Sequence, residues 1–481
     1  MEENLNSKVR NATKWSTVTE IAAKLVTPIT SMVLARLLTP EAFGVVATLT
    51  MIISFAELFT DAGFQKYLIQ HEFRDEEDRE QSTTVAFWSN LVMSLFLWGV
   101  IAIFADPLAT LVGNPGLGNV LIVACVSIPL AAFSSIQMAL YKRDFDFKTL
   151  FKVRMVAVVI PVLVTIPLAF LLRSYWALII GTITVNLVNA VLLTLYSKWK
   201  PRLFYSFAKL KEMLSFTIWT MIEQVSIWLT GYVDVFIVGT MLSQYYLGLY
   251  KTSSTLVGQI MGIVVAIATP VLFSGLSRLQ NDEKEFQRLF FRFQKIVGLM
   301  VIPMGVGIYI FRDFITQIVL GDQWLEASGF IGLWALMNAL AIVLAHFASE
   351  VYRAKGKPKL SVLAQFLHII VLWPVVLIFV RQGFEALYIA RSLVRLEFIA
   401  VQLCLMGLIL KMPVGRMITN VLPSCLAACC MFLVLILPPY EGIFMNILYI
   451  LLASLIYLIV IMMFPKERTT LLNLPKLIRN K

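Results

Sequence analysis

Long apolar segments, separated by short polar connections, follow one another along almost the whole chain. A helix needs about 20 predominantly apolar residues to cross the hydrocarbon core of a bilayer. By this measure the sequence predicts about fourteen spans. We place them at residues 15–38, 42–65, 83–104, 119–141, 153–172, 174–196, 213–240, 247–275, 293–311, 328–351, 360–380, 384–409, 420–437 and 443–464. No connection is long enough to fold alone, so we expect the chain to work within the bilayer.

The composition supports the same fold class. Of the 481 residues, 59% are hydrophobic and 14% are charged, whereas about a quarter of the residues of a soluble domain are charged. The formal net charge is +11, but the basic residues are dispersed between apolar segments and do not form a nucleic-acid-binding patch. The five cysteines lie in apolar segments and lack the spacing of metal ligands. We therefore expect an all-α polytopic membrane protein without a metal site.

The basic residues indicate how the chain is oriented. With the N-terminus inside, the two terminal segments and the alternate connections on the same side hold about 32 of the 40 Lys and Arg residues. Cytoplasmic loops of membrane proteins carry such an excess of positive charge. This distribution favours an even number of spans with both termini on the cytoplasmic side. The polar N-terminal segment has no signal-peptide pattern, so the first predicted helix is expected to direct insertion.

Three short patterns recur along the chain in the same order. LLTPEAFGVV at 37–46 resembles MLSQYYLGLY at 241–250, and PLATLVGN at 107–114 resembles ITQIVLGD at 315–322. QMALYKR similarly resembles SEVYRAK, at an offset that has grown to about 211 residues. These repeats favour two six-helix lobes of the same orientation at 1–200 and 201–410, followed by two helices and a cytoplasmic tail at 411–481. Transporters built from parallel repeats bind their substrate between the lobes and rock one lobe against the other.

Several motifs also resemble those of a known family. They are ARLLTPEAFGVVA, FTDAGFQKYLIQ, YKRDFDFK, YVDVFIVGTMLSQYYLGLYKTSS and LGDQWLEA, which lie between residues 35 and 327. The motifs resemble those of polysaccharide flippases, the Wzx-like branch of the multidrug/oligosaccharidyl-lipid/polysaccharide (MOP) exporter superfamily, which also includes the MATE transporters. Most of them look like loop and packing signatures, so they indicate the branch and not the sugar that is carried.

The resemblance implies a fold and a function. The fold is V-shaped, with two lobes that give alternating access. The function is to flip an undecaprenyl-diphosphate-linked oligosaccharide, such as a repeat unit of O-antigen, capsule or exopolysaccharide, from the inner to the outer leaflet of the bacterial plasma membrane. Several relatives couple transport to an ion, so H⁺ or Na⁺ coupling is expected here in place of a cofactor. Partners would be membrane lipids and a polysaccharide polymerase.

Ionisable residues inside the predicted spans are candidates for the site, because burying a charge in hydrocarbon costs about 2.5–3.5 kcal/mol or more. Polar residues at helical spacing form stripes on the first two spans and on the seventh. The candidates for a substrate cleft are Glu20, Lys24, Glu57, Glu223, Arg391 and Arg395. Arginine makes planar, multidentate contacts with phosphate oxygens, so Arg391 or Arg395 is expected to meet the diphosphate. The alternative for these arginines is an ion pair with Glu397 or Glu350, and for Glu20 an ion pair with Lys24.

Other charged residues have different expected roles. Ion coupling would use Glu57, Glu20 or His346, because a buried carboxylate has a raised pKa and could exchange a proton. Four residues in family motifs or near the ends of spans are expected to be structural: Arg36, Asp61, Asp234 and Lys251. Asp61 and Glu57 share one helical face, but Glu57 lies about 6 Å deeper at 1.5 Å of rise per residue.

The sequence has three alternatives to a polysaccharide flippase. The D-x-D pattern of Asp144 and Asp146 could hold a metal and a nucleotide sugar in a glycosyltransferase, but it lies in a short inner loop. A lipid II flippase and a MATE-type drug or cation antiporter are nearer alternatives. No GxxxxGK[ST] motif is present, which argues against direct use of ATP. We therefore expect a transporter and not an enzyme.

Overall fold

The computed structural model describes residues 15, 19, 26–61, 63–437 and 442–479. All regular elements of these residues are helices, joined by turns and loops. The chain divides into two compact units, Met1–Lys251 and Thr252–Lys481. The expected all-α polytopic class is confirmed. The lobe boundary expected near residue 200 stays a prediction, because a division by compactness does not test the repeat.

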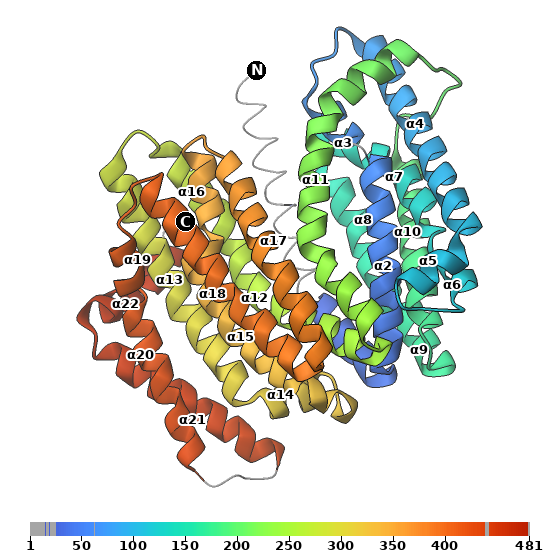
Figure 1. Ribbon diagram of the computed structural model, residues 1–481. Helices are drawn as coiled ribbons and strands as arrows, with labels where there is room; N and C mark the ends of the chain where they lie inside the picture. The colour runs from blue at the N-terminus through green and yellow to red at the C-terminus, as the bar shows by residue number, and fades with distance from the viewer. Residues whose placement is uncertain (1–14, 16–18, 20–25, 62, 438–441, 480–481) are drawn as a thin grey trace. The chain divides into compact units, whose positions relative to one another are not determined.

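Helices of the first unit follow a short helical stretch at Val26–Leu37. They are α2 (Pro40–Asp61), α3 (Phe64–Gln70), α4 (Glu76–Ile103), α5 (Ala105–Leu111), α6 (Gly118–Ala124), α7 (Ser127–Arg143), α8 (Phe147–Ile160), α9 (Ile166–Leu172), α10 (Trp176–Tyr196) and α11 (Phe207–Met241). A π-helical turn, η1 (Pro161–Thr165), joins α8 to α9. The long α12 (Gln244–Arg278) begins in this unit and continues into the second. Within the first unit, α7 packs against α2, α3, α4 and α10 (Figure 1).

The described part of the second unit contains α-helices and four shorter turns of 3₁₀ or π type. They are α13 (Glu283–Ile310), α14 (Arg312–Val319), η2 (Asp322–Ala327), α15 (Ser328–Ala341), the π-helical η3 (Ile342–His346), α16 (Ala348–Ala354), α17 (Lys359–Phe379), η4 (Val380–Gln382), α18 (Phe384–Leu408), α19 (Val414–Thr419), α20 (Leu422–Cys430), η5 (Met431–Ile436), α21 (Ile443–Met462) and α22 (Pro465–Arg479). Here α15 packs against both α13 and α18, and α17 packs against α18.

Eleven helical segments of the described chain are long and apolar enough to cross a membrane. The other three predicted spans coincide with shorter or more charged helices. Val26–Leu37 and Ile227–Met241 are apolar but short, and α18 carries Arg391, Arg395 and Glu397 near its middle. The chain is thus a multi-pass membrane protein, and the count of fourteen stays a prediction.

Aspartate side chains start three helices at the connections predicted to be cytoplasmic. Asp75 accepts a hydrogen bond from the Asp78 backbone N–H at 2.7 Å, and so caps α4. Asp146 caps α8 through the Thr149 N–H at 3.1 Å, and Asp282 caps α13 through the Glu285 N–H at 3.1 Å. Each carboxylate satisfies a backbone donor that the helix itself leaves unpaired, and its charge suits the positive end of the helix dipole.

The first half of α11 is tied to the first unit by polar contacts. Lys209 forms an ion pair with Asp78 of α4. The Tyr67 hydroxyl of α3 donates a hydrogen bond to Glu212 Oε1 at 3.0 Å. Burial, and then this contact with a carboxylate, raise the pKa of Tyr67 above its ordinary value. These contacts explain why α11, the seventh predicted span, lies in the first unit.

Two glycines of the first repeated pattern pack reciprocally. A Cβ added to Gly44 would lie 1.9 Å from the carbonyl oxygen of Gln244, and one added to Gly248 would lie 1.8 Å from that of Pro40. Pro40 and Gln244 are the first residues of α2 and α12, and they correspond to each other in the aligned patterns, as the two glycines do. The two copies of the pattern therefore contact each other symmetrically, at a distance that only glycine permits.

We expect Gly248→Ala to destabilise the chain by about 1–3 kcal/mol, because the new methyl group must displace backbone rather than a flexible side chain. Gly258→Ala, in the same helix, is the matched control, since a Cβ there meets nothing within 4 Å. Thermal unfolding of the purified protein, followed by size-exclusion chromatography after heating, measures both. Equal melting temperatures for the two variants would contradict the reciprocal contact.

Candidate functional site

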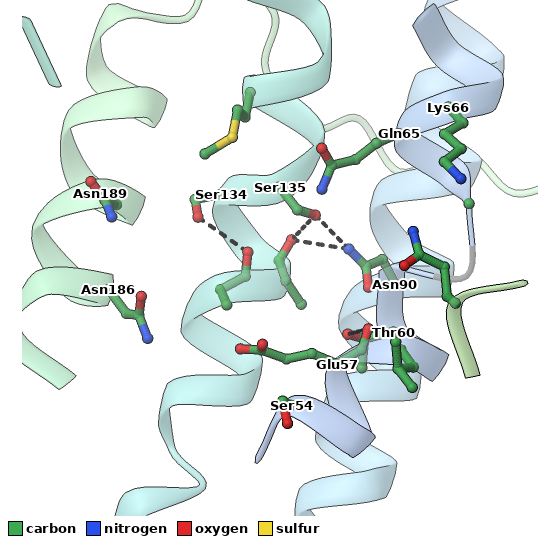
Figure 2. A pocket seen from close by; sticks show the side chains of 16 residues that line it. Ser54, Glu57, Thr60, Gln65, Lys66, Asn90, Ser134, Ser135, Asn186 and Asn189 are labelled. Atoms are coloured by element: carbon green, nitrogen blue, oxygen red, sulfur yellow. Dashed lines mark hydrogen bonds between the residues drawn. The ribbon is translucent and has the colours of Figure 1, made fainter. Parts of the chain in front are cut away.

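A polar cavity of about 360 Å³ lies inside the first unit. Its walls come from α2, α3, α4, α7, α10 and α11, which are otherwise mostly apolar. Figure 2 shows the side chains that line it. The polar ones are Ser54, Glu57, Thr60, Gln65, Lys66, Asn90, Ser134, Ser135, Asn186, Asn189 and Gln224. Two of these side chains are charged, the Glu57 carboxylate and the Lys66 ammonium group, and the others are amides and hydroxyls.

Glu57 is the sequence-predicted candidate that the structure places in this cavity. It lies on α2 one turn after Ser54, whose hydroxyl donates to the Met51 carbonyl at 2.9 Å. The indole N–H of Trp228 in α11 donates to the same Ser54 oxygen at 2.9 Å. This hydrogen bond joins the polar face of α2 to α11. Glu57 lies on the same helix and lines the cavity. Its part in substrate binding or ion coupling stays a prediction.

Asn90 of α4 is fully buried in the wall of the cavity, with 0% of its surface exposed. Its amide nitrogen donates to Ser135 Oγ at 2.7 Å and to the Ala132 carbonyl at 3.2 Å, both in α7 (Figure 2). Its carbonyl oxygen Oδ1 has no hydrogen-bond partner. The same oxygen has almost no accessible surface, so Asn90 supports the wall of the cavity through its contacts with α7.

Sequence reasoning missed most of the cavity wall. Asn186 and Asn189 lie three residues apart on α10, and Figure 2 shows both amides at one side of the cavity. The signal was a pair of asparagines at helical spacing in an otherwise apolar span. Such a pair is a weak signal, because neutral polar side chains stand out less in an apolar span than ionisable ones do. The cavity is lined mostly by neutral polar side chains.

Arg391 and Arg395 lie in a different cluster, inside the second unit. Their guanidinium carbons are 4.8 and 4.6 Å from the centre of the Trp334 ring of α15. Arg391 is 6% exposed. Contacts of this kind between a cation and an aromatic face are stronger where water is excluded. Trp334 was not identified from the sequence.

Glu397 and Glu350, the carboxylates expected as alternative partners of these arginines, contact other residues. Glu397 Oε2 lies 2.8 Å from Nδ1 of His368 in α17, and Glu350 forms an ion pair with Arg353. His368 is 3% exposed and was not among the predicted residues. The second unit thus contains a buried cluster of charged and aromatic groups on α15, α17 and α18.

The remaining predicted residues are placed as follows. Asp234 is buried and accepts hydrogen bonds from the Tyr250 hydroxyl at 2.6 Å and from the Val235 N–H at 2.8 Å. The Lys251 ammonium lies 5.0 Å from the Tyr232 ring centre. Arg36 and His346 are exposed, and His346 ends the π-helical η3. Glu20 and Lys24 lie outside the described residues, as do the side chains of Asp61 and Glu223.

Both carboxylates of the D-x-D pattern have structural partners. Asp144 accepts two hydrogen bonds at 2.9 Å from one nitrogen of Arg79 in α4. Asp146 caps α8 and also accepts from the Thr149 hydroxyl at 2.7 Å. Within the described residues, no three His, Cys, Asp or Glu side chains gather as metal ligands would. The pattern is explained by helix capping and an ion pair.

Apolar helices that enclose a polar cavity define a membrane protein of the transporter class. The chain belongs to the polysaccharide biosynthesis protein family, whose model matches residues 33–329. It is 24% identical to the succinoglycan biosynthesis transport protein ExoT of Rhizobium meliloti, with 71% of this chain and 68% of that one covered. It is 21% identical to the lipopolysaccharide biosynthesis protein WzxC of Escherichia coli, with 67% and 65% covered. The teichuronic acid biosynthesis protein TuaB of Bacillus subtilis is 19% identical, with 74% of each chain covered.

Two solved structures share the fold. The lipid II flippase MurJ, in an inward closed conformation, matches with a TM-score of 0.77 and 15% identity, over 94% of this chain and 99% of that one. An inward-facing multidrug resistance MATE transporter of the MOP superfamily matches with a TM-score of 0.62 and 14% identity, over 82% and 96%. Both likenesses concern the fold alone. They confirm the all-helical, MurJ- and MATE-like fold that the sequence motifs implied.

We expect Tyr250→Phe to lower the free energy of unfolding by about 1.5–3 kcal/mol, because hydrogen bonds to a charged group contribute about that much. Tyr196→Phe, at an exposed position, is the control and should leave it unchanged. The measurement is the melting temperature of the purified protein. A structural role for Asp234 would be contradicted if Tyr250→Phe melted like the unmodified chain.

Proposed function

We propose that this protein carries a lipid-linked oligosaccharide from the inner to the outer leaflet of a bacterial plasma membrane, as a transporter and not as an enzyme. The family match supports a role in polysaccharide biosynthesis, and one similar protein is named as a transport protein. The observation that carries the proposal is the polar cavity, because amides, hydroxyls and a carboxylate line it on helices that are otherwise apolar. Such groups are costly in hydrocarbon and mark the path of a polar substrate.

The physical problem in flipping such a substrate has two parts. The sugar diphosphate head is too polar to enter hydrocarbon, whereas the lipid tail is most stable there. A protein with a polar interior between its helices allows the head to pass while the tail stays in the bilayer. In alternating access, rocking of two repeats would expose that interior first to one side and then to the other. The cytoplasmic placement of both termini is part of this proposal.

Arg391 and Arg395 of α18 are proposed to bind the diphosphate. Guanidinium groups make bidentate contacts with phosphate oxygens and stack on aromatic faces, and Arg391 and Arg395 already lie over Trp334. Glu57, Glu20 and His346 are proposed for coupling to H⁺ or Na⁺. A polymerase that joins the delivered repeat units is the proposed partner. The lipid II flippase and MATE functions receive support from the fold alone.

Deletion of the gene is expected to stop export of the host's surface polysaccharide and to leave lipid-linked oligosaccharide in the inner leaflet. Leaflet position is measured by the access of an impermeant sugar-oxidising or lectin reagent in intact cells and in inverted vesicles. Re-expression of the intact chain should restore labelling from outside. Unchanged delivery to the outer leaflet in the deletion strain would reject the function.

Two substitutions test the proposed residues. Glu57→Gln and Arg391→Ala are each expected to lower transport about tenfold or more at equal amounts of folded protein, since one lost charged contact is worth about 1.5–3 kcal/mol. Glu41→Gln on α2 and Arg381→Ala, both at exposed positions, are the matched controls. Full transport by both test variants would remove Glu57 and Arg391 from the site.

A further inference from the structure

The walls of the cavity in the first unit are unusual in their hydrogen-bonding chemistry. Amide side chains come from four different helices, with Gln65 on α3, Asn90 on α4, Asn186 and Asn189 on α10, and Gln224 on α11. Serine and threonine hydroxyls from α2 and α7 lie between them. An amide offers both donors and an acceptor. Each of these hydroxyls donates to a carbonyl of its own helix and so offers a ligand only its lone pairs. A ligand that fits these walls must likewise donate and accept hydrogen bonds in many directions.

The charges in the cavity point to the same class of ligand. Glu57 places a carboxylate among the lining groups, and Lys66 places an ammonium group there. The two opposite charges offset each other, so the cavity has no net positive charge to hold a diphosphate, whereas a sugar hydroxyl can donate to a carboxylate and accept from an ammonium group. The volume of about 360 Å³ falls within the range of about 300–1,000 Å³ typical of small-ligand pockets. An uncharged sugar ring therefore suits the cavity better than the diphosphate does.

We propose that the cavity formed by α2, α3, α4, α7, α10 and α11 is a carbohydrate subsite, which binds a neutral sugar ring of the transported head group within the first unit alone. This inference rests on the proposed function and assigns its parts: the sugar is bound by amides and hydroxyls here, and the diphosphate is bound elsewhere. Asn186 and Asn189 are specificity-determining residues of the subsite. Their spacing of one helical turn presents two amides to adjacent hydroxyls of the ring.

The test uses the full-length chain purified in detergent. The probe is the repeat-unit oligosaccharide obtained by partial hydrolysis of the host's own surface polysaccharide, which carries no lipid and no diphosphate. Binding is measured by isothermal titration calorimetry. We expect Asn186→Ala and Asn189→Ala each to weaken binding about five- to tenfold, as the loss of one or more hydrogen bonds predicts. Inorganic pyrophosphate should not displace the oligosaccharide.

Two further variants separate binding from folding. Asn189→Leu has a similar volume and suits an apolar helix, so it should fold and still lose affinity. Thr182→Ala lies on the same helix at an exposed position, where the hydroxyl donates only to the Leu178 carbonyl at 2.9 Å, and should bind normally. Wild-type affinity in the folded Asn189→Leu variant, or displacement of the sugar by pyrophosphate, overturns the subsite.

The outcome is distinct from that of the transport experiment. If deletion leaves polysaccharide delivery unchanged while the asparagine variants lose sugar binding, the subsite stands and the flipping function fails. If deletion blocks delivery while the variants bind and transport normally, the function stands and the subsite fails.

Discussion

Every backbone N–H and C=O group inside a bilayer must find a partner within the protein, because hydrocarbon offers none. This constraint explains why the described chain is helical and why its connections are short. Helix ends are the one place where backbone groups remain unpaired. Here Asp75, Asp146 and Asp282 each satisfy such a group at the start of a helix. The same requirement accounts for the D-x-D pattern, whose second aspartate is one of these caps.

Helices that satisfy their own backbone associate in a membrane through close packing. The reciprocal contact of Gly44 with Gln244 and of Gly248 with Pro40 is an example in this chain. It involves the two copies of a repeated pattern, so the glycine in each copy makes room for the first residue of the other copy's helix. A local sequence similarity that could have arisen by chance acquires a physical reason: a symmetric contact requires the same small residue on both sides.

Two groups of polar side chains inside the units differ in their chemistry. The cavity of the first unit is lined by amides, hydroxyls and Glu57, whereas the cluster of the second unit combines Arg391 and Arg395 with Trp334 and contains the His368–Glu397 pair. The first suits a neutral, hydroxyl-rich ligand, and the second suits an anion. A lipid-linked sugar diphosphate contains both kinds of group, which is why the two clusters are assigned to different parts of one substrate.

The sequence by itself determined the membrane class, the approximate positions of the helices and the family resemblance, and it identified Glu57 as a candidate for the site. It could do so because apolar periodicity, charge distribution and motifs are local properties. Only the tertiary structure decided that Asn90, Ser135, Asn186 and Asn189 surround one cavity with Glu57, that Trp334 lies beneath two arginines, and that Glu397 pairs with His368. Neutral polar residues carry no cost large enough to stand out in a sequence, and contacts between helices far apart in the chain depend on packing that no local pattern encodes.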